Sequence, residues 1–144
     1  MAEVIAVCIS EKRGTKKKQI AFLDVKCGHG IVGDAHAGNW HRQVSLLAQE
    51  SVDKMTHTGL QLMPGVFAEN ILTKGIELSK LPVGTIIDIG SSTLRVTQIG
   101  KKCHNECEIK KLVGHCVMPT EGIFAEVLKD GRITPGDSIN IREV

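Results

Sequence analysis

The chain has 144 residues, of which 42% are hydrophobic and 24% charged, and these values are typical of one globular domain spanning residues 1–144. A formal net charge of +2 at pH 7 is too small to indicate a surface that follows nucleic-acid phosphates. Three Phe, one Trp and no Tyr leave few rings for base stacking, so we expect no nucleic-acid partner.

No apolar run approaches the roughly 20 residues that a membrane span needs. The first residues, "MAEVIAVCIS", show no basic leader and no small-residue cleavage site. We therefore expect a cytoplasmic protein with no membrane partner. Five cysteines are an odd number, and a reducing compartment does not favour a disulfide framework, so each thiol needs its own explanation.

Strands are predicted near the start of the chain, where β-branched residues alternate with others. They are "EVIAVCIS" at 3–10 and "KQIAFLDVKC" at 18–27. The basic run "EKRGTKKKQ" at 11–19 lies between two apolar runs and is predicted to be a solvated hairpin tip. Cys8 and Cys27 fall within the apolar strand patterns, and we expect both to be small buried side chains.

A helix is predicted next. Ser45 is a suitable N-cap for "LLAQESVDKMTHT", whose apolar residues recur with approximately helical spacing, and Gly59 is suited to end it. A second short helix, "EIKKLVG", is predicted at 108–114.

The remaining predicted elements are strands. "GTIIDIG", the turn "SS" and "TLRVTQIG" read as a hairpin over 84–100. Two further strands follow in 122–128 and 132–144, with Asp130-Gly131 as a hairpin signal between them. Short strands at this spacing indicate a barrel or a closed sandwich.

A glycine-rich segment over residues 28–47, "GHGIVGDAHAGNWHRQVSLL", is the first candidate site. Its glycines, Gly33 among them, permit close approach of the backbone to a ligand. Asp34 and His36 would share one face of an extended chain, either as a metal pair or as a hydrogen-bonded loop brace. Arg42 either offers its planar fork to a phosphate or carboxylate, or is an ordinary surface arginine.

Glu69 and Asn70 stand among apolar residues in "MPGVFAENILTKGIEL" at 63–78. An unpaired buried amide would cost roughly 1–3 kcal/mol, so the pair must be exposed or hydrogen-bonded. Asn70 is suited either to read the amide edge of a heterocycle or to brace a turn.

The stretch "CHNECEIKKLVGHCVMP" at 103–119 holds Cys103, Cys107 and Cys116. A zinc site would need a second close pair of ligands, and a redox dithiol more typically reads C-x-x-C. The third interpretation is one reactive thiolate. Cys103 follows two lysines, Lys102 being adjacent, and precedes a histidine, and this cationic setting favours thiolate over thiol. Cys103 is therefore the leading nucleophile or metal ligand.

In this order and spacing, several segments resemble the stand-alone MOSC domain, a family named for the C-terminal domain of molybdenum cofactor sulfurase. The segments that carry the resemblance are "GIVGDAHAG" (30–38), "HRQVSLL" (41–47), "PGVFAENIL" (64–72), "LRVTQIGKKC" (94–103) and "GIFAEVLKDGRITPGDSI" (122–139). The resemblance implies a mainly β fold, a MOSC-type closed or partly open β-barrel with one or two short helices. It also implies a molybdenum cofactor (molybdopterin) binding or handling module.

Residue by residue, the resemblance maps the cysteine that marks the family onto Cys103. There it would carry molybdenum or a transferable sulfur. The family's pocket motifs map onto Gly33, Asp34, His36, Arg42, Glu69 and Asn70. Lys102 stands where metal-binding relatives often carry Arg. The expected partners are molybdenum cofactor biosynthesis proteins, or a donor of sulfur or electrons, and no pyridoxal phosphate is expected in this chain.

Two alternatives stay open on the sequence. One is a molybdenum-dependent reductase of N-hydroxylated compounds that takes electrons from a partner. The other is a structural zinc or thiol-regulated protein built on Cys103, Cys107 and Cys116. The sequence therefore leaves open whether the protein is an enzyme.

Overall fold

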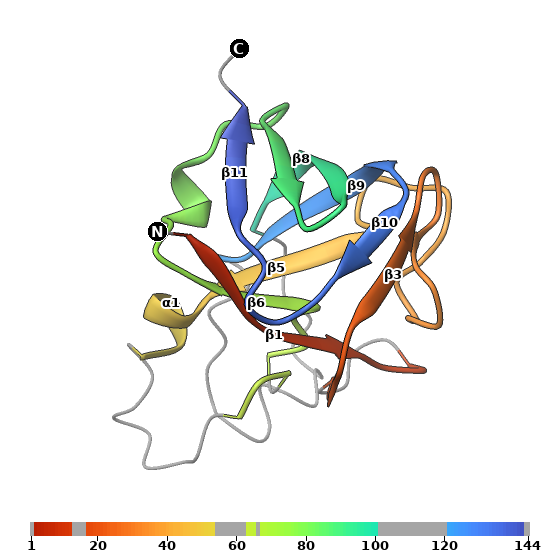
Figure 1. Cartoon of the computed structure of the whole chain (residues 1–144), viewed down its shortest axis with the longest axis horizontal. Coiled ribbons are helices and arrows are strands. Elements are labelled where there is room, and N and C mark those ends of the chain that lie inside the picture. The colour runs from red at the N-terminus through yellow and green to blue at the C-terminus, as the bar shows by residue number, and fades with distance from the viewer. Residues whose placement is uncertain (1, 13–16, 54–62, 66, 101–120, 143–144) are drawn as a thin grey trace.

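The computed structural model of the chain describes residues 2–12, 17–53, 63–65, 67–100 and 121–142 (Figure 1). Over these residues the protein is mainly β, as the sequence predicts. The elements are β1 Glu3–Ile9, β2 Lys18–Ile20, β3 Leu23–Lys26, β4 Gly30–Ile31, β5 Val44–Ala48, α1 Gln49–Asp53, β6 Ile71–Lys74, the 3-10 turn η2 Leu78–Lys80, β7 Ile86–Ile89, β8 Ser92–Ile99, β9 Ile123–Lys129, β10 Gly131–Ile133 and β11 Ile139–Arg142.

The strands form a mixed sheet of eight strands in the order β11-β7-β8-β9-β5-β6-β1-β2 and a three-stranded sheet in the order β10-β3-β4. Only β5 and β6 pair in parallel; the other described ladders are antiparallel. Figure 1 shows β3 and β10 lying to one side of the larger sheet. Aliphatic side chains of both sheets, such as Val25, Leu46 and Ile133, form one core.

Closure into a barrel is not found among the described strands. The ladders of the larger sheet end at β11 and β2. One isolated antiparallel bridge joins Glu3 of β1 to Ser138, just before β11. The backbone N–H of Val4 also donates to the carbonyl of Asp137 at 2.9 Å. The N–H of Gly136 donates to the Val4 carbonyl at 2.7 Å, and the N–H of Ile139 donates to the Ala2 carbonyl at 3.0 Å. The sheet therefore curls until β1 meets the start of β11, without a continuous ladder there.

The predicted helix over residues 46–58 is wrong at its start. Val44–Ala48 is strand β5, every residue of which is buried, and the described helix α1 covers Gln49–Asp53. Ser45 lies within the strand, so it is not an N-cap. A strand buried on both faces gives a continuous apolar run, which by periodicity alone cannot be told from a buried helix.

The hairpin predicted over residues 84–100 is confirmed, because β7 and β8 pair antiparallel with Ile89 opposite Ser92. Its turn is Gly90-Ser91, one residue earlier than predicted. The second hairpin is wrong: β10 pairs with β3, not with β9, placing Arg132 opposite Asp24. The side chain of Asp130 instead accepts a 2.7 Å hydrogen bond from the Cys27 N–H, so the chain passes here to the smaller sheet.

Two other expectations from the sequence concern helices. In the part of the chain that the structure describes, no helix is long and apolar enough to cross a membrane. The helix predicted at 108–114 lies outside the described residues.

Candidate functional site

A buried lysine connects the chain before β2 to the glycine-rich loop after β4. Lys17 is 4% exposed, and its ammonium lies 2.8 Å from Asp34 Oδ1, 3.1 Å from His36 Nδ1 and 3.1 Å from Ser10 Oγ. The side chains of Lys17 and Asp34 are both fully shielded from solvent. The solvated-tip interpretation of residues 11–19 is therefore wrong for Lys17, although Lys12 and Lys18 are exposed.

Asp34 is held by the backbone as well as by Lys17. Its carboxylate accepts the N–H of Ser10 at 3.1 Å and the N–H of His36 at 3.1 Å. Gly33 enters this turn with φ +88°, a conformation that L side chains rarely adopt. Burial works to raise the pKa of Asp34, but the hydrogen bonds that its carboxylate accepts, together with the charge of Lys17, outweigh it and hold the pKa below its usual value. This arrangement is typical of a loop brace.

The same loop stacks aromatic and cationic side chains. The rings of His36 and Trp40 lie 6.5 Å apart at an interplanar angle of 4°, and the Trp40 indole N–H donates to the His36 carbonyl at 2.7 Å. The Arg42 guanidinium carbon lies 4.7 Å from the Trp40 ring centre and 5.6 Å from that of Phe124. These contacts place the half-buried Arg42 against β9.

Arg42 has an unused hydrogen-bond donor. Its Nε is buried and finds no hydrogen-bond partner among the described residues. A buried guanidinium nitrogen without an acceptor is costly, and anions such as carboxylate and phosphate, which can accept two hydrogen bonds from the fork, are the usual partners of this group. The interpretation of Arg42 as an ordinary surface arginine does not fit this environment.

The loop is attached to the end of β8. His41 Nε2 lies 2.8 Å from Gln98 Oε1, and the hydroxyl of Thr97 donates to the His41 carbonyl. The Gln98 amide in turn donates to the Gly100 carbonyl at 2.8 Å. Gly100 is the last described residue before 101–120, so the loop that carries Arg42 is attached close to the residue at which this described range ends.

Asn70 is fully buried and its amide is engaged within the protein. Its Oδ1 accepts from the backbone N–H of Ser45 at 2.9 Å and from the Ser45 hydroxyl at 3.0 Å, and its Nδ2 donates to the Cys8 carbonyl at 3.0 Å. Asn70 thereby joins β1 and β5 where β6 begins. This geometry favours the bracing role over recognition of a heterocycle.

Glu69 braces the loop before β6. It is 1% exposed, and its carboxylate accepts the N–H groups of Gly65 at 2.9 Å and Phe67 at 3.2 Å. Burial raises the pKa of Glu69 to about 7, although these hydrogen bonds and the charge of Lys17 oppose the shift. Glu69 thus belongs to the same buried polar region as Lys17 and Asp34.

Ionisation of Glu69 should make folding pH-dependent. With a pKa of about 7 in the folded state against 4.5 as its ordinary value, the cost of its buried charge is absent below pH 4.5 and grows as pH rises to about 7. The free energy of unfolding should fall by up to about 3 kcal/mol across that window. Urea denaturation at several pH values measures this loss, and Glu69→Gln should lack it; an equal slope in both proteins would contradict the assignment.

The cysteines differ in environment. Cys8 is fully buried, as predicted, and burial raises the pKa of its thiol to about 12, which makes it unreactive. Cys27 is exposed, contrary to the prediction, because it follows the last residue of β3. Lys102, Cys103, Cys107 and Cys116 lie outside the described residues. Within the described ranges, no group of three or more His, Cys, Asp or Glu residues could hold a metal.

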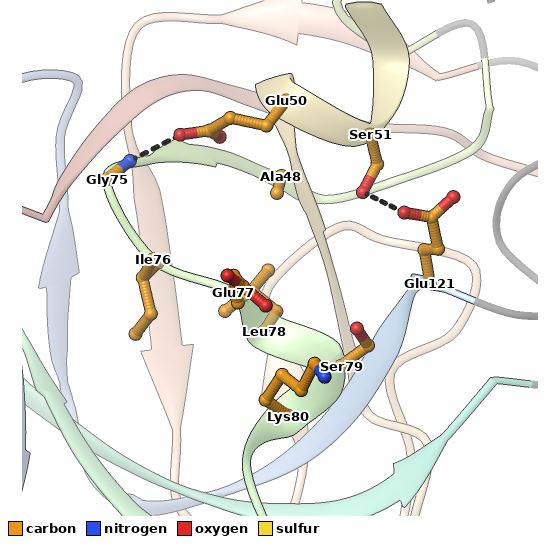
Figure 2. Close-up of a pocket in the computed structure, with 10 residues that line it drawn as sticks. All are labelled: Ala48, Glu50, Ser51, Gly75, Ile76, Glu77, Leu78, Ser79, Lys80 and Glu121. Atoms are coloured by element: carbon orange, nitrogen blue, oxygen red, sulfur yellow. Dashed lines mark hydrogen bonds between the residues drawn. The ribbon is translucent and has the colours of Figure 1, made fainter. Parts of the chain in front are cut away.

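A cavity of about 560 Å³ lies elsewhere, at the ends of β5 and β6 opposite to Arg42 and Asn70. Its walls include Ala48, Gly75 and Lys80. The Gly75 N–H donates a hydrogen bond to the Glu50 carboxylate at 2.8 Å, and the Ser51 hydroxyl donates one to the Glu121 carboxylate at 2.9 Å. Figure 2 shows both hydrogen bonds. None of the predicted site residues that the structure describes lines this cavity.

The structure thus brings together some predicted site residues. Asp34 and His36 meet at Lys17, Arg42 is linked to His36 through Trp40, and Glu69 lies near Lys17. Lys17 and Trp40 were not predicted. Trp40 had one signal in the sequence, since it is the single tryptophan and stands inside the glycine-rich segment.

Fold and site together define a small β domain with a mixed sheet. Its glycine-rich loop holds Arg42, whose Nε has no partner among the described residues, beside the end of β8. The family model of the MOSC domain matches residues 33–140. The chain belongs to the MOSC domain family. Comparison with curated proteins gave no match.

Solved structures support the fold. The YuaD protein from Bacillus subtilis superposes with a TM-score of 0.80 at 21% identity, covering 100% of this chain and 97% of its own. YiiM from Geobacillus stearothermophilus gives a TM-score of 0.75 at 19% identity, covering 99% and 76%. YiiM from Escherichia coli gives 0.69 at 17% identity, covering 99% and 70%. At these identities the likeness concerns the fold.

Proposed function

We propose that the protein binds or handles a molybdenum cofactor of the molybdopterin type beside the end of β8. In this proposal Arg42 holds the phosphate of the pterin, and the Cys103 thiolate holds molybdenum or a transferable sulfur. When bound, the cofactor supplies a metal centre that takes soft sulfur ligands and changes oxidation state. The enzymatic alternative, a reductase of N-hydroxylated compounds, would need an electron donor and stays a prediction from the family resemblance.

The observation that carries the proposal is that the buried Nε of Arg42 has no hydrogen-bond partner among the described residues. Its guanidinium is fixed in place by two aromatic rings, at 4.7 Å and 5.6 Å, so its fork is held in one orientation before any ligand arrives. A phosphate would supply the missing acceptor and remove the cost of the buried donor. The donor set of this chain therefore fits an anionic, phosphate-bearing cofactor.

Cys103 is assigned by its place in the chain. It follows Gly100 by three residues, and Gly100 comes directly after β8, the strand to which the Arg42 loop is attached. A thiolate is a suitable ligand for a soft metal and a suitable carrier of sulfur. In the carrier role, the terminal sulfur of a donor persulfide would bond to Cys103, and the donor would leave as its thiolate. The proposed partners are accordingly cofactor biosynthesis proteins or a sulfur donor.

Loading with purified molybdenum cofactor tests the role of Cys103. Wild-type protein should retain close to one equivalent of molybdenum or, after treatment with a persulfide donor, one added sulfur atom by mass spectrometry. Cys103→Ala should lose the corresponding signal. The matched control is Cys27→Ala, which removes an exposed thiol on the smaller sheet. Equal retention by Cys103→Ala and wild type would refute the role of Cys103, and no molybdenum and no sulfur on wild type would refute the proposed function.

Arg42→Lys should weaken cofactor binding by at least tenfold. Lysine keeps the charge but loses the planar fork and the stacking on Trp40. Titration with cofactor, followed by the quenching of tryptophan fluorescence, measures the dissociation constant. Arg132→Lys is the matched control, because Arg132 also lies over an aromatic ring, that of Phe22 at 3.9 Å, but on the smaller sheet. Equal weakening in both variants would contradict a specific role for Arg42.

A further inference from the structure

The hydrogen bonds of the Lys17 ammonium determine the tautomer of the neighbouring His36 ring. Lysine has three N–H donors and no acceptor. Among the described residues, three acceptors lie within hydrogen-bond distance: Asp34 Oδ1 at 2.8 Å, Ser10 Oγ at 3.1 Å and His36 Nδ1 at 3.1 Å. The ammonium of Lys17 forms a buried ion pair with the Asp34 carboxylate. In the contact between Lys17 and His36, the lysine therefore donates and Nδ1 accepts.

A neutral imidazole that accepts at Nδ1 must carry its proton at Nε2. The competing arrangement, Nδ1–H donating to Asp34, is poorer because Nδ1 lies 3.7 Å from Asp34 Oδ2. Asp34 Oδ2 already accepts the backbone N–H of His36 at 3.1 Å. The ring is also held from the other side by Trp40, with an interplanar angle of 4°.

The Nε2–H of His36 has no hydrogen-bond partner within the described part of the chain, and the His36 side chain is 18% exposed. We propose that Lys17 is a positioning residue that holds His36 as its Nε2–H tautomer, so that this N–H is offered as a donor to an acceptor atom of a bound ligand. The ligand class is one with a phosphate, carbonyl or ring-nitrogen acceptor; its identity as molybdopterin rests on the proposed function.

This assignment changes the chemistry expected of Asp34 and His36. A metal pair would require His36 to present an unprotonated nitrogen toward the ion. Here the unprotonated nitrogen is occupied by the Lys17 ammonium, and the Asp34 carboxylate is occupied by Lys17 and two backbone N–H groups. In this arrangement Asp34 holds Lys17, and His36 offers its Nε2–H as a hydrogen-bond donor.

Nitrogen-15 NMR of histidine-labelled protein without cofactor tests the tautomer. The chain has six histidines, and His36→Gln identifies the His36 signals by their loss. Wild type should show His36 with an unprotonated Nδ1 and a protonated Nε2 at neutral pH. Lys17→Met/Asp34→Asn, which removes both buried charges together, should lose this exclusive tautomer. A protonated Nδ1 in wild type, or an unchanged tautomer in the double variant, would overturn the positioning role of Lys17.

Addition of purified cofactor separates this inference from the proposed function. Cofactor that binds near His36 should shift the Nε2 resonance in wild type, and Arg42→Lys, which leaves His36 intact, should need at least tenfold more cofactor for the same shift. Binding that leaves the Nε2 resonance unmoved would overturn the donor role of His36. Failure of cofactor to bind at all would refute the proposed function, while the tautomer in the cofactor-free protein would still decide the role of Lys17.

Discussion

Gly65→Ala is expected to destabilise the protein by about 3 kcal/mol or more, a large part of the roughly 5–15 kcal/mol that stabilises a folded domain. Gly65 has φ +91°, and a Cβ there would lie 2.1 Å from the carbonyl oxygen of Lys17 and 3.3 Å from Cys8 Sγ. The Lys17 N–H also donates to the Gly65 carbonyl at 2.7 Å. The methyl group would therefore separate two backbones that hold the buried lysine in place.

Gly136→Ala is the matched control for this prediction. Gly136 has a similar φ, +96°, but a Cβ there would meet nothing within 4 Å. It should cost about 1–2 kcal/mol, which is the strain of the left-handed conformation alone. Chemical denaturation of both variants measures the difference. Equal losses of stability would show that the close approach of Gly65 to Lys17 contributes nothing.

Lys17→Met should cost about 3–5 kcal/mol, because it leaves the Asp34 carboxylate buried and without its counter-ion. Lys17→Met/Asp34→Asn should recover most of this loss, since an amide oxygen can still accept the N–H groups of Ser10 and His36. Free energies of unfolding from urea titrations give both values. A double variant no more stable than Lys17→Met would contradict the ion-pair explanation.

The dependence of stability on pH in the acid range provides a second test of the Lys17–Asp34 ion pair. The pKa of Asp34 is held below its ordinary value of 3.8, so the stability it contributes is complete above about pH 4 and is lost as pH falls below that value. The difference in free energy of unfolding between wild type and Lys17→Met should therefore become smaller as pH falls through 3.8. A gap that stays constant between pH 6 and pH 3 would show that the lost stability comes from packing rather than charge.

Regular alternation explains which parts of the fold could be predicted. In the β7–β8 hairpin, β7 alternates between half-buried and buried residues and a glycine stands at the turn, and the sequence shows both features. Strand β5 lacks alternation because both of its faces are covered, so its apolar run was assigned to a helix. The pairing of β10 with β3 depends on residues more than 100 positions apart, which no local turn signal reports.

The candidate site was predictable to a similar extent. Asp34, His36 and Arg42 stand in one short glycine-rich segment, and a segment of this kind typically carries a site. Lys17 could not be recognised, because a lysine within a basic run is normally solvated and its partners lie 17 and 19 residues away. The sequence allows Asn70 either to recognise a heterocycle or to brace a turn. Only its contacts with Ser45 and Cys8 distinguish these two roles.

In the first form of the proposed function, Cys103 provides a sulfur ligand to molybdenum beside Arg42. X-ray absorption at the molybdenum edge, recorded on cofactor-loaded wild type and on Cys103→Ser, tests it most directly. The wild-type spectrum should contain one more sulfur neighbour than the pterin dithiolene provides, and Cys103→Ser should replace that sulfur by oxygen. Identical sulfur coordination in the two loaded proteins would contradict the claim.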